Sequence, residues 1–261
     1  MKIKRSLCLF LSCIFLLSAS AAAADHATKK TDTVSVFAHK DTMQVDIEQV
    51  SEMPDPERLP PDPDKPYIAL TFDDGPNYLT TPKVLDALDK YGARATFFVL
   101  GQRINNKTSD LLVRMIESGS EIGNHSYDHP ILSNLTKSGI RDQINRTETL
   151  VYNACGQKPT LIRPPYGSVN SRVLETISQP AVLWSVDTLD WESRNTKKIV
   201  AKVLDNVESG DIILMHDIYA STANAVEPIL KILSEQGYQF VTVSELLELR
   251  GDTVEAGKKY Y

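Results

Sequence analysis

Residues 67–76 read YIALTFDDGP, and they give the clearest indication of the fold. Its first six residues are apolar, aromatic or β-branched, which is typical of a strand buried in a parallel sheet. The strand ends on two adjacent carboxylates, Asp73 and Asp74, followed by a Gly-Pro turn. In parallel α/β proteins, catalytic groups collect at the carboxyl ends of the strands. The stretch therefore predicts a parallel strand that delivers two acidic side chains to an active site.

The rest of the chain alternates strand-like and helix-like segments. Strands are expected at Tyr67–Phe72, Thr96–Leu100, Ser120–Gly123, Leu161–Arg163, Ala181–Val186, Ile212–His216 and Phe240–Val243. Amphipathic helices are expected at Pro82–Lys90, Ser109–Glu117, Ser138–Asn153, Ser171–Ile177, Thr196–Val207 and Ala223–Gln236. This alternation predicts a parallel α/β fold. A barrel is favoured over an open sheet because reactive side chains follow most of the strands.

The chain before the first strand has two parts. Residues 1–24 have a basic start, a short apolar stretch and a small-residue end, and predict a signal peptide. An uncleaved membrane anchor is the alternative. Residues 25–66 are polar and rich in proline, which predicts a stiff linker. The catalytic domain is expected at residues 67–250 and a C-terminal tail at 251–261. The protein is expected to be secreted or associated with the cell wall.

Charge and cysteine content exclude several classes of protein. When residues 1–24 are left out, the chain has 25 Lys and Arg and 34 Asp and Glu, which gives a formal net charge of −9. This argues against binding to nucleic acid or to anionic lipid. Cys155 would remain as a single cysteine, so no intramolecular disulfide is expected. No glycine-rich nucleotide motif is present, and no obligate protein partner is evident.

A metal site is indicated by His125 and His129, which follow a predicted strand with three residues between them. With one carboxylate they would form a two-histidine, one-aspartate set that leaves positions open for water and substrate. Two surface histidines are the competing interpretation of this spacing. The pair Asp73 and Asp74 allows a division of labour, in which one carboxylate binds the metal and the other takes a proton from water.

Two further strand ends carry chemistry. His216 ends an apolar strand, and with Asp190 to hold its proton it is suited to act as a general acid. Arg163 precedes a rigid Pro-Pro-Tyr-Gly turn and could orient a carboxylate, while the turn presents a backbone N–H to an oxyanion. A satisfied core histidine and simple packing of the turn are the alternatives.

These motifs occur in an order that resembles the polysaccharide deacetylases, the NodB-homology family of carbohydrate esterase family 4. The five matching motifs are Thr71-Phe-Asp-Asp-Gly75, His125-Ser-Tyr-Asp-His129, Arg163-Pro-Pro-Tyr-Gly167, Asp187-Thr-Leu-Asp-Trp191 and Leu214-Met-His216. The resemblance covers about residues 67–245, nearly the whole expected domain. The resemblance implies a distorted (β/α) barrel with about seven parallel strands, in agreement with the count above.

The resemblance also implies a role for each matching residue. Asp74, His125 and His129 would bind the divalent metal, with Zn²⁺ expected and Co²⁺, Ni²⁺, Mn²⁺ or Fe²⁺ as alternatives. The catalytic set would comprise the general base Asp73, its orienting Arg163, the general acid His216 and its support Asp190. Substrate contacts are expected from Tyr166, Pro164, Trp191 and Leu214.

The expected reaction is removal of N-acetyl groups from a polysaccharide, first of all from peptidoglycan N-acetylglucosamine. Chitin oligomers and acetyl xylan are alternative substrates, and the residues do not separate N-acetylglucosamine from N-acetylmuramic acid. A wall-binding protein without catalysis is a different class, disfavoured because binding alone needs no acid–base set. A ferrous oxygenase is disfavoured because no co-substrate site is evident.

Overall fold

A computed structural model describes residues 60–261 of the chain. The expected signal peptide and most of the expected linker lie outside the described residues. Eight strands are described: β1 Tyr67–Asp73, β2 Ala95–Val99, β3 Glu121–Asn124, β4 Ala181–Val182, β5 Val186–Asp187, β6 Ile212–His216, β7 Gln239–Phe240 and β8 Lys259–Tyr260. The longer helices are α1 Thr81–Lys90, α2 Ser109–Glu117, α3 Lys137–Cys155, α6 Thr196–Leu204, α7 Ala220–Glu235 and α8 Val243–Leu249. The short ones are η2 Gly101–Arg103, η3 Leu132–Asn134, η4 Pro165–Gly167, α4 Ser171–Leu174 and α5 Asp190–Ser193.

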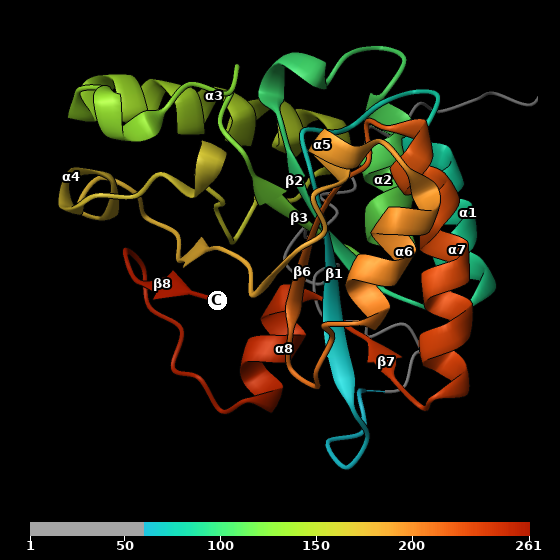
Figure 1. Cartoon of the computed structure of the whole chain (residues 1–261). Helices are drawn as coiled ribbons and strands as arrows, with labels where there is room; N and C mark the ends of the chain where they lie inside the picture. Colours follow the sequence, from blue (N-terminus) through green and yellow to red (C-terminus); the bar gives the residue numbers. More distant parts are fainter. Residues whose placement is uncertain (1–59) are drawn as a thin grey trace, which may run out of the picture. The chain divides into compact units, whose positions relative to one another are not determined.

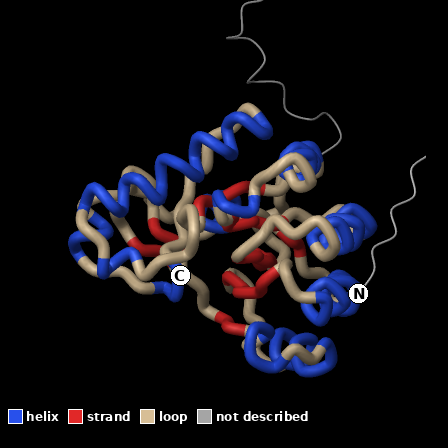
Figure 2. Tube along the Cα trace, turned by 90° about the horizontal axis from the view of Figure 1, so that it is seen from above, coloured by secondary structure: helices blue, strands red, loops and turns tan. Residues whose placement is uncertain are grey.

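All strand pairings between described residues are parallel. The main sheet runs β3-β2-β1-β6-β5, and β7 also pairs with β1. Ile162 forms bridges with Asn124 on one side and Ala181 on the other, which carries the sheet on to β4 and β8. The path β5, β6, β1, β2, β3, Ile162 and β4 has seven positions, and the helices surround it when seen from above (Figure 2). The predicted parallel α/β fold is confirmed.

Alternation along β1 separates two sides of the sheet. Ile68, Leu70 and Phe72 face the large core formed with α1, α2, α6 and α7 on one side in Figure 1. Ala69 belongs to the inner core that includes Phe98 and residues of α8. Because successive side chains of a strand point to opposite faces, Thr71 and Asp73 also point inward. The central strand thus has apolar residues on its helix side and carries a carboxylate on its inner side.

Three predicted segments differ from the structure. The segment Ala181–Val186 is split into β4 and β5, because Leu183 N–H bonds to Tyr260 while Ser185 N–H bonds to Ile212. Its backbone therefore changes neighbour from β8 to β6. Leu161–Arg163 contributes only the Ile162 bridges. The expected strand Phe240–Val243 is shorter and shifted, because Val243 begins α8 behind a Thr242 capping box.

Both edges of the expected domain continue into ordered structure. Before β1, Asp62 and Gln239 exchange two hydrogen bonds, Asp62 N to Oε1 at 2.8 Å and Nε2 to Asp62 O at 2.7 Å. At the other end, β8 lies within residues 251–261, where a tail was expected, and pairs with β4. No helix in the described part of the chain is long and apolar enough to cross a membrane.

Candidate active site

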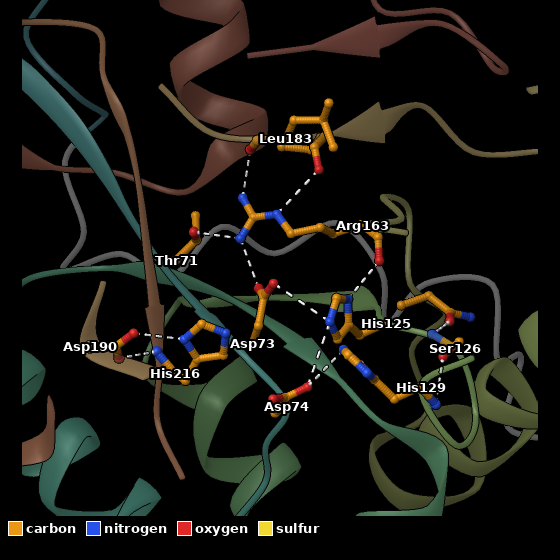
Figure 3. A network of polar contacts seen from close by, with 12 residues as sticks. Thr71, Asp73, Asp74, His125, Ser126, His129, Arg163, Leu183, Asp190 and His216 are labelled. Atoms are coloured by element: carbon orange, nitrogen blue, oxygen red, sulfur yellow. Dashed lines mark hydrogen bonds and ion pairs between the residues drawn. The ribbon is translucent and has the colours of Figure 1, made fainter. Parts of the chain in front are cut away.

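The predicted catalytic residues meet at the carboxyl ends of the strands. Asp73 ends β1 and lies opposite His216, which ends β6. His125 follows β3, Arg163 follows the Ile162 bridge and Asp190 begins α5 after β5. Figure 3 shows these side chains converging, with Asp73 between His216 and the two other histidines. They line or border a pocket of about 360 Å³, lined by Asp73, Asp74, His125, His129, Tyr166, Trp184, Asp187, Trp191, Leu214, His216 and Tyr219.

Three of these side chains form a set suited to a metal ion. The ligand atoms of Asp74, His125 and His129 all lie within 4.8 Å of one another. Asp74 Oδ1 lies 3.7 Å from His125 Nε2 and 3.4 Å from His129 Nε2. This oxygen is buried and has no hydrogen-bond partner. A buried carboxylate oxygen without a donor is costly, and a cation between it and the imidazole nitrogens would satisfy it. The residues therefore fit a divalent metal.

The state of His125 also suits a ligand. Its Nδ1 lies 2.6 Å from the carbonyl oxygen of Arg163, an acceptor, so Nδ1 carries the proton. Nε2 is then left with its lone pair facing Asp74, as in metal-binding histidines whose other nitrogen donates to a carbonyl. For His129, burial and the neighbouring His125 lower the pKa, which favours the neutral form that binds metals.

Side-chain acceptors hold the loop between the two histidines in shape. Ser126 N–H donates to Asn124 Oδ1 at 2.8 Å, and His129 N–H donates to Ser126 Oγ at 3.1 Å. Gln143 Oε1 accepts from the N–H of Tyr127 at 2.8 Å. Within this loop Ser126 and His129 have positive φ values of 73° and 66°. Such backbone is uncommon outside glycine and collects at functional sites, because the surrounding bonds must impose it.

Asp73 is held by a buried ion pair. Arg163 is fully buried, and its Nη1 donates to Asp73 Oδ1 at 2.8 Å and to Thr71 Oγ1 at 2.7 Å. Its remaining donors reach the carbonyl oxygens of Val182 at 3.2 Å and Leu183 at 2.8 Å. Burial lowers the pKa of the guanidinium, and Asp73 opposes that effect. The second oxygen, Asp73 Oδ2, is 3.6 Å from His125 Nε2 and stays directed at the metal set.

His216 is paired with Asp190 on the other flank. Its Nδ1 lies 2.8 Å from Asp190 Oδ1, and its backbone N–H donates to Asp190 Oδ2 at 2.7 Å. Asp190 also accepts from Thr222 Oγ1 at 2.7 Å and from Trp191 N–H at 2.8 Å. Burial lowers the pKa of His216. The hydrogen bond and the charge of Asp190, together with the charges of Asp73 and Asp74, outweigh burial and raise the pKa of His216 to about 9. His216 is therefore protonated at neutral pH, as a general acid must be.

The expected substrate residues are divided in the structure. Tyr166, Trp191 and Leu214 line the pocket, and the Tyr166 ring packs edge-on against His129 at 4.5 Å between ring centres. Tyr166 has φ 59° in the turn η4, which directs its side chain outward. Pro164 is buried and lies outside the pocket lining, where its carbonyl accepts from Gly167 N–H at 3.0 Å. Its place in the structure is that of a turn residue.

Several residues of the site were not singled out from the sequence. Trp184, Asp187 and Tyr219 line the pocket, and Thr71 and Thr222 hold catalytic partners. Asp217, directly after His216, is fully buried, and its Oδ1 has no hydrogen-bond partner. Burial raises the pKa of Asp217 to about 7. Among these residues Thr71 and Asp187, each of which begins one of the five motifs, had a visible sequence signal.

The comparisons with known proteins agree with this geometry. Residues 61–182 match the sequence profile of the polysaccharide deacetylase family. The chain is 47% identical over 189 residues to the peptidoglycan-N-acetylmuramic acid deacetylase PdaC of Bacillus subtilis, covering 72% of this chain and 40% of that protein. A peptidoglycan-N-acetylglucosamine deacetylase of Bacillus cereus is 40% identical over 191 residues, covering 70% of this chain and 89% of the relative. The chain belongs to the polysaccharide deacetylase family.

Solved structures of relatives share the fold. The structure of B. subtilis PdaC aligns with a TM-score of 0.71 at 46% identity, covering 73% of this chain and 94% of that one. A family 4 acetyl xylan esterase from Clostridium thermocellum, in complex with a cobalt ion, aligns with a TM-score of 0.71 at 36% identity, covering 74% of this chain and 97% of that one. The described residues thus have the fold of a carbohydrate esterase family 4 deacetylase. The alignment with the B. subtilis relative covers only 40% of the length of that protein.

Proposed function

We propose that this protein is a metal-dependent hydrolase that removes N-acetyl groups from the amino sugars of peptidoglycan and releases acetate. The observation that carries the proposal is the pair of oriented acid–base groups beside the metal set. Arg163 holds Asp73 on one flank, and Asp190 holds His216 on the other. Peptidoglycan is favoured as substrate because two relatives are named as peptidoglycan deacetylases.

Asp73 and His216 divide the proton transfers of amide hydrolysis. As a water molecule attacks the acetyl carbon, Asp73 takes a proton from it and the carbonyl oxygen gains negative charge. His216, protonated because its pKa is raised, gives its proton to the amide nitrogen, and the C–N bond then breaks. The products are acetate and a free amino sugar. A divalent cation bound by Asp74, His125 and His129 would polarise the carbonyl and lower the pKa of the attacking water.

The metal ion is proposed to be Zn²⁺. A set of two imidazoles and one carboxylate suits zinc, and the solved esterase with this fold is in complex with a cobalt ion. Because such nitrogen and oxygen ligands discriminate weakly, Co²⁺, Ni²⁺, Mn²⁺ and Fe²⁺ remain alternatives to be compared by metal content and activity.

The proposed site of action is the cell wall outside the membrane, with residues 1–24 as signal peptide. The peptidoglycan-named relatives and the sequence of this segment support that location. Fractionation of cells would test this location, and an uncleaved segment would leave the protein in the membrane fraction.

Deacetylation of chitin oligomers is a second candidate activity. Hydrolysis of acetyl xylan is a third, supported by the fold shared with an acetyl xylan esterase.

The decisive experiment measures acetate release from peptidoglycan, N-acetylglucosamine oligomers and acetylated xylan. The protein is stripped of metal and reloaded with Zn²⁺ beforehand. Metal-dependent release from peptidoglycan supports the proposal, and release from xylan alone replaces it with an esterase. Retention of zinc without release from any substrate would identify a wall-binding protein.

Variants separate the roles within the site. Asp73→Asn should keep the bound metal and lose activity, and near-full activity would remove Asp73 as the base. Asp74→Asn and His125→Ala should lose metal affinity. Asp128→Asn is the matched control, because Asp128 lies between the two histidines in the sequence but accepts from Gln143 at 2.8 Å. Equal metal content in all four variants would contradict the ligand assignment.

A further inference from the structure

Two arginines on the catalytic face have no salt bridge to any carboxylate between residues 60 and 261. Arg194 follows α5, and Arg103 ends η2, which follows β2. Other arginines of this region, such as Arg114 and Arg163, are paired with aspartates. Because the chain has an excess of acidic residues, unpaired arginines beside an active site are candidates for substrate recognition.

Arg194 is fixed at the rim of the pocket. Its Nε donates to the carbonyl oxygen of Trp191 at 2.7 Å, and its guanidinium carbon lies 3.3 Å from the centre of the Tyr219 ring. Its backbone has φ 46°, a left-handed conformation that is costly for a residue other than glycine. Tyr219 lines the pocket, and its ring centre is 5.9 Å from that of His216. Arg194 is thus one aromatic ring away from the proposed general acid.

The terminal nitrogens of Arg194 are available for an anion. Only Nε has a hydrogen-bond partner within the described chain, so the planar fork of two NH₂ groups is free. Such a fork binds carboxylates through two parallel hydrogen bonds. Stacking on Tyr219 restricts the orientation of the group before any ligand arrives, which reduces the entropy lost on binding.

Arg103 adds positive charge to the same flank. Its Nε is buried and has no hydrogen-bond partner. Burial raises the pKa values of Asp217 and Tyr219, and Arg103 acts against this effect at both groups. Arg103 therefore lies within electrostatic range of the same tyrosine on which Arg194 stacks.

These cations offset an otherwise acidic pocket. Asp73, Asp74 and Asp187 line it, and they would repel a negatively charged substrate. A neutral substrate needs no compensating arginine at the rim. The competing explanation is that Arg194 only packs against Tyr219 and Trp191 and so supports the rim mechanically.

We propose that Arg194, with the positive charge of Arg103 in support, binds a carboxylate that the glycan carries next to the N-acetyl group, so that the preferred substrates are acid-substituted amino sugars. The inference rests on the proposed deacetylase function. In peptidoglycan this carboxylate has two sources. One is the lactyl ether on the ring carbon next to the acetamido carbon of muramic acid, and the other is the stem peptide that extends from it.

Three tetrasaccharide substrates separate the sources. Chitotetraose, here the tetrasaccharide of N-acetylglucosamine, is neutral. An alternating N-acetylglucosamine–N-acetylmuramic acid tetrasaccharide has free lactyl carboxylates. The same tetrasaccharide with stem peptides attached has only peptide carboxylates. The values of kcat and KM are measured for the wild type, Arg194→Gln and Arg103→Gln. Arg172→Gln is the matched control, because exposed Arg172 likewise donates to one backbone carbonyl, that of Leu135 at 3.2 Å, and lies outside the pocket lining.

Arg194→Gln should lower kcat/KM on the recognised carboxylate substrate about tenfold more than on chitotetraose, mainly through KM. The difference should shrink as salt is added, and Arg172→Gln should show none. The substrate on which the loss appears identifies the lactyl or the peptide carboxylate. An equal loss on all three, or none on either acidic substrate, overturns the inference. Wild-type inactivity on every substrate would instead overturn the proposed function.

Discussion

The hydrogen bond between His216 and Asp190 should set the pH at which activity is lost on the alkaline side. Burial lowers the pKa of His216, but Asp190, Asp73 and Asp74 outweigh it and raise this pKa from 6.5 to about 9. Asp190→Asn removes the nearest negative charge and should return this pKa to about 6.5 or below. At pH 8 the protonated fraction of His216 would then fall from about 90% to about 3%, a loss of about 30-fold. At pH 6 the same substitution reduces it only about 1.3-fold.

The assay is the pH dependence of kcat/KM for acetate release between pH 5.5 and 10. In Asp190→Asn the alkaline limb should move from about 9 to about 6.5. Asp187→Asn is the control for loss of a pocket carboxylate. Asp187 lines the pocket and accepts from Leu189 N–H at 2.8 Å, away from His216, so its limb should stay in place. A loss in Asp190→Asn that is the same at every pH would refute this account of the pair.

The same pair links stability to pH. A raised pKa means that the folded state holds the proton more tightly than the unfolded chain does. The shift from 6.5 to about 9 stabilises the fold by roughly 3 kcal/mol below pH 6.5, and this contribution is lost as the pH rises through 9. Urea unfolding of the wild type at pH 6 and pH 10, with Asp190→Asn beside it, measures the contribution.

Three further results are expected. Asp217→Asn should make the protein more stable at pH 8 by a few kcal/mol, because the buried Asp217 carboxyl ionises above its raised pKa of about 7 and its charge destabilises the fold. Denaturant titrations at pH 5 and pH 8 should show a larger gain in unfolding free energy at pH 8. Gly75→Ala should destabilise by roughly 1–3 kcal/mol, because a Cβ there overlaps the Asp217 carboxylate, and Asp217→Ala should relieve most of that cost in a double-mutant cycle. Saturating Zn²⁺ should raise the melting temperature of the wild type, whereas His129→Ala should show no such rise.

The sequence predicted the parts of the fold in which a buried strand and its reactive end are contiguous. β1, β2, β3 and β6 lie within a residue or two of the expected strands. β1, β2 and β6 are mainly apolar runs buried on both faces, and β3 is buried at three of its four positions. The first five expected helices also begin within one residue of the expected starts, as α1, α2, α3, α4 and α6, although α4 ends at Leu174, earlier than expected. For these elements the local pattern and the tertiary structure agree.

The segments that were not predicted depend on neighbours distant in the chain. β4 and β5 divide because one half pairs with β8 and the other with β6. β8 exists only as a partner of β4, so residues 259–260 carry little signal of their own. The helix α8 was missed for a different reason. Its Thr242 and Glu245 form a capping box, a helix-start signal that is present in the sequence.

The catalytic residues were found from the sequence because each lies at a strand end, within a short motif. Thr222 and Tyr219 were not found, because they lie on and just before α7 and reach the site only through the packing of that helix against α6 and α1. The buried Asp217 was passed over because its neighbour His216 accounted for the motif. Its burial behind Gly75 is a property of tertiary structure alone.

The two halves of the site rest on parts of the molecule with different resistance to opening. Asp73 ends a strand that is hydrogen-bonded on both edges, to β2 and β6, so its surroundings should exchange amide hydrogens only when the whole domain unfolds. Trp191 lies in the four-residue helix α5, and Arg194 follows its last residue. Left-handed residues, Leu189 and Arg194, flank this short helix, and the segment can open locally. Under mild denaturant the contacts of α5, the stacking of Arg194 on Tyr219 and the Asp190–His216 pair, should therefore be lost before the Arg163–Asp73 pair.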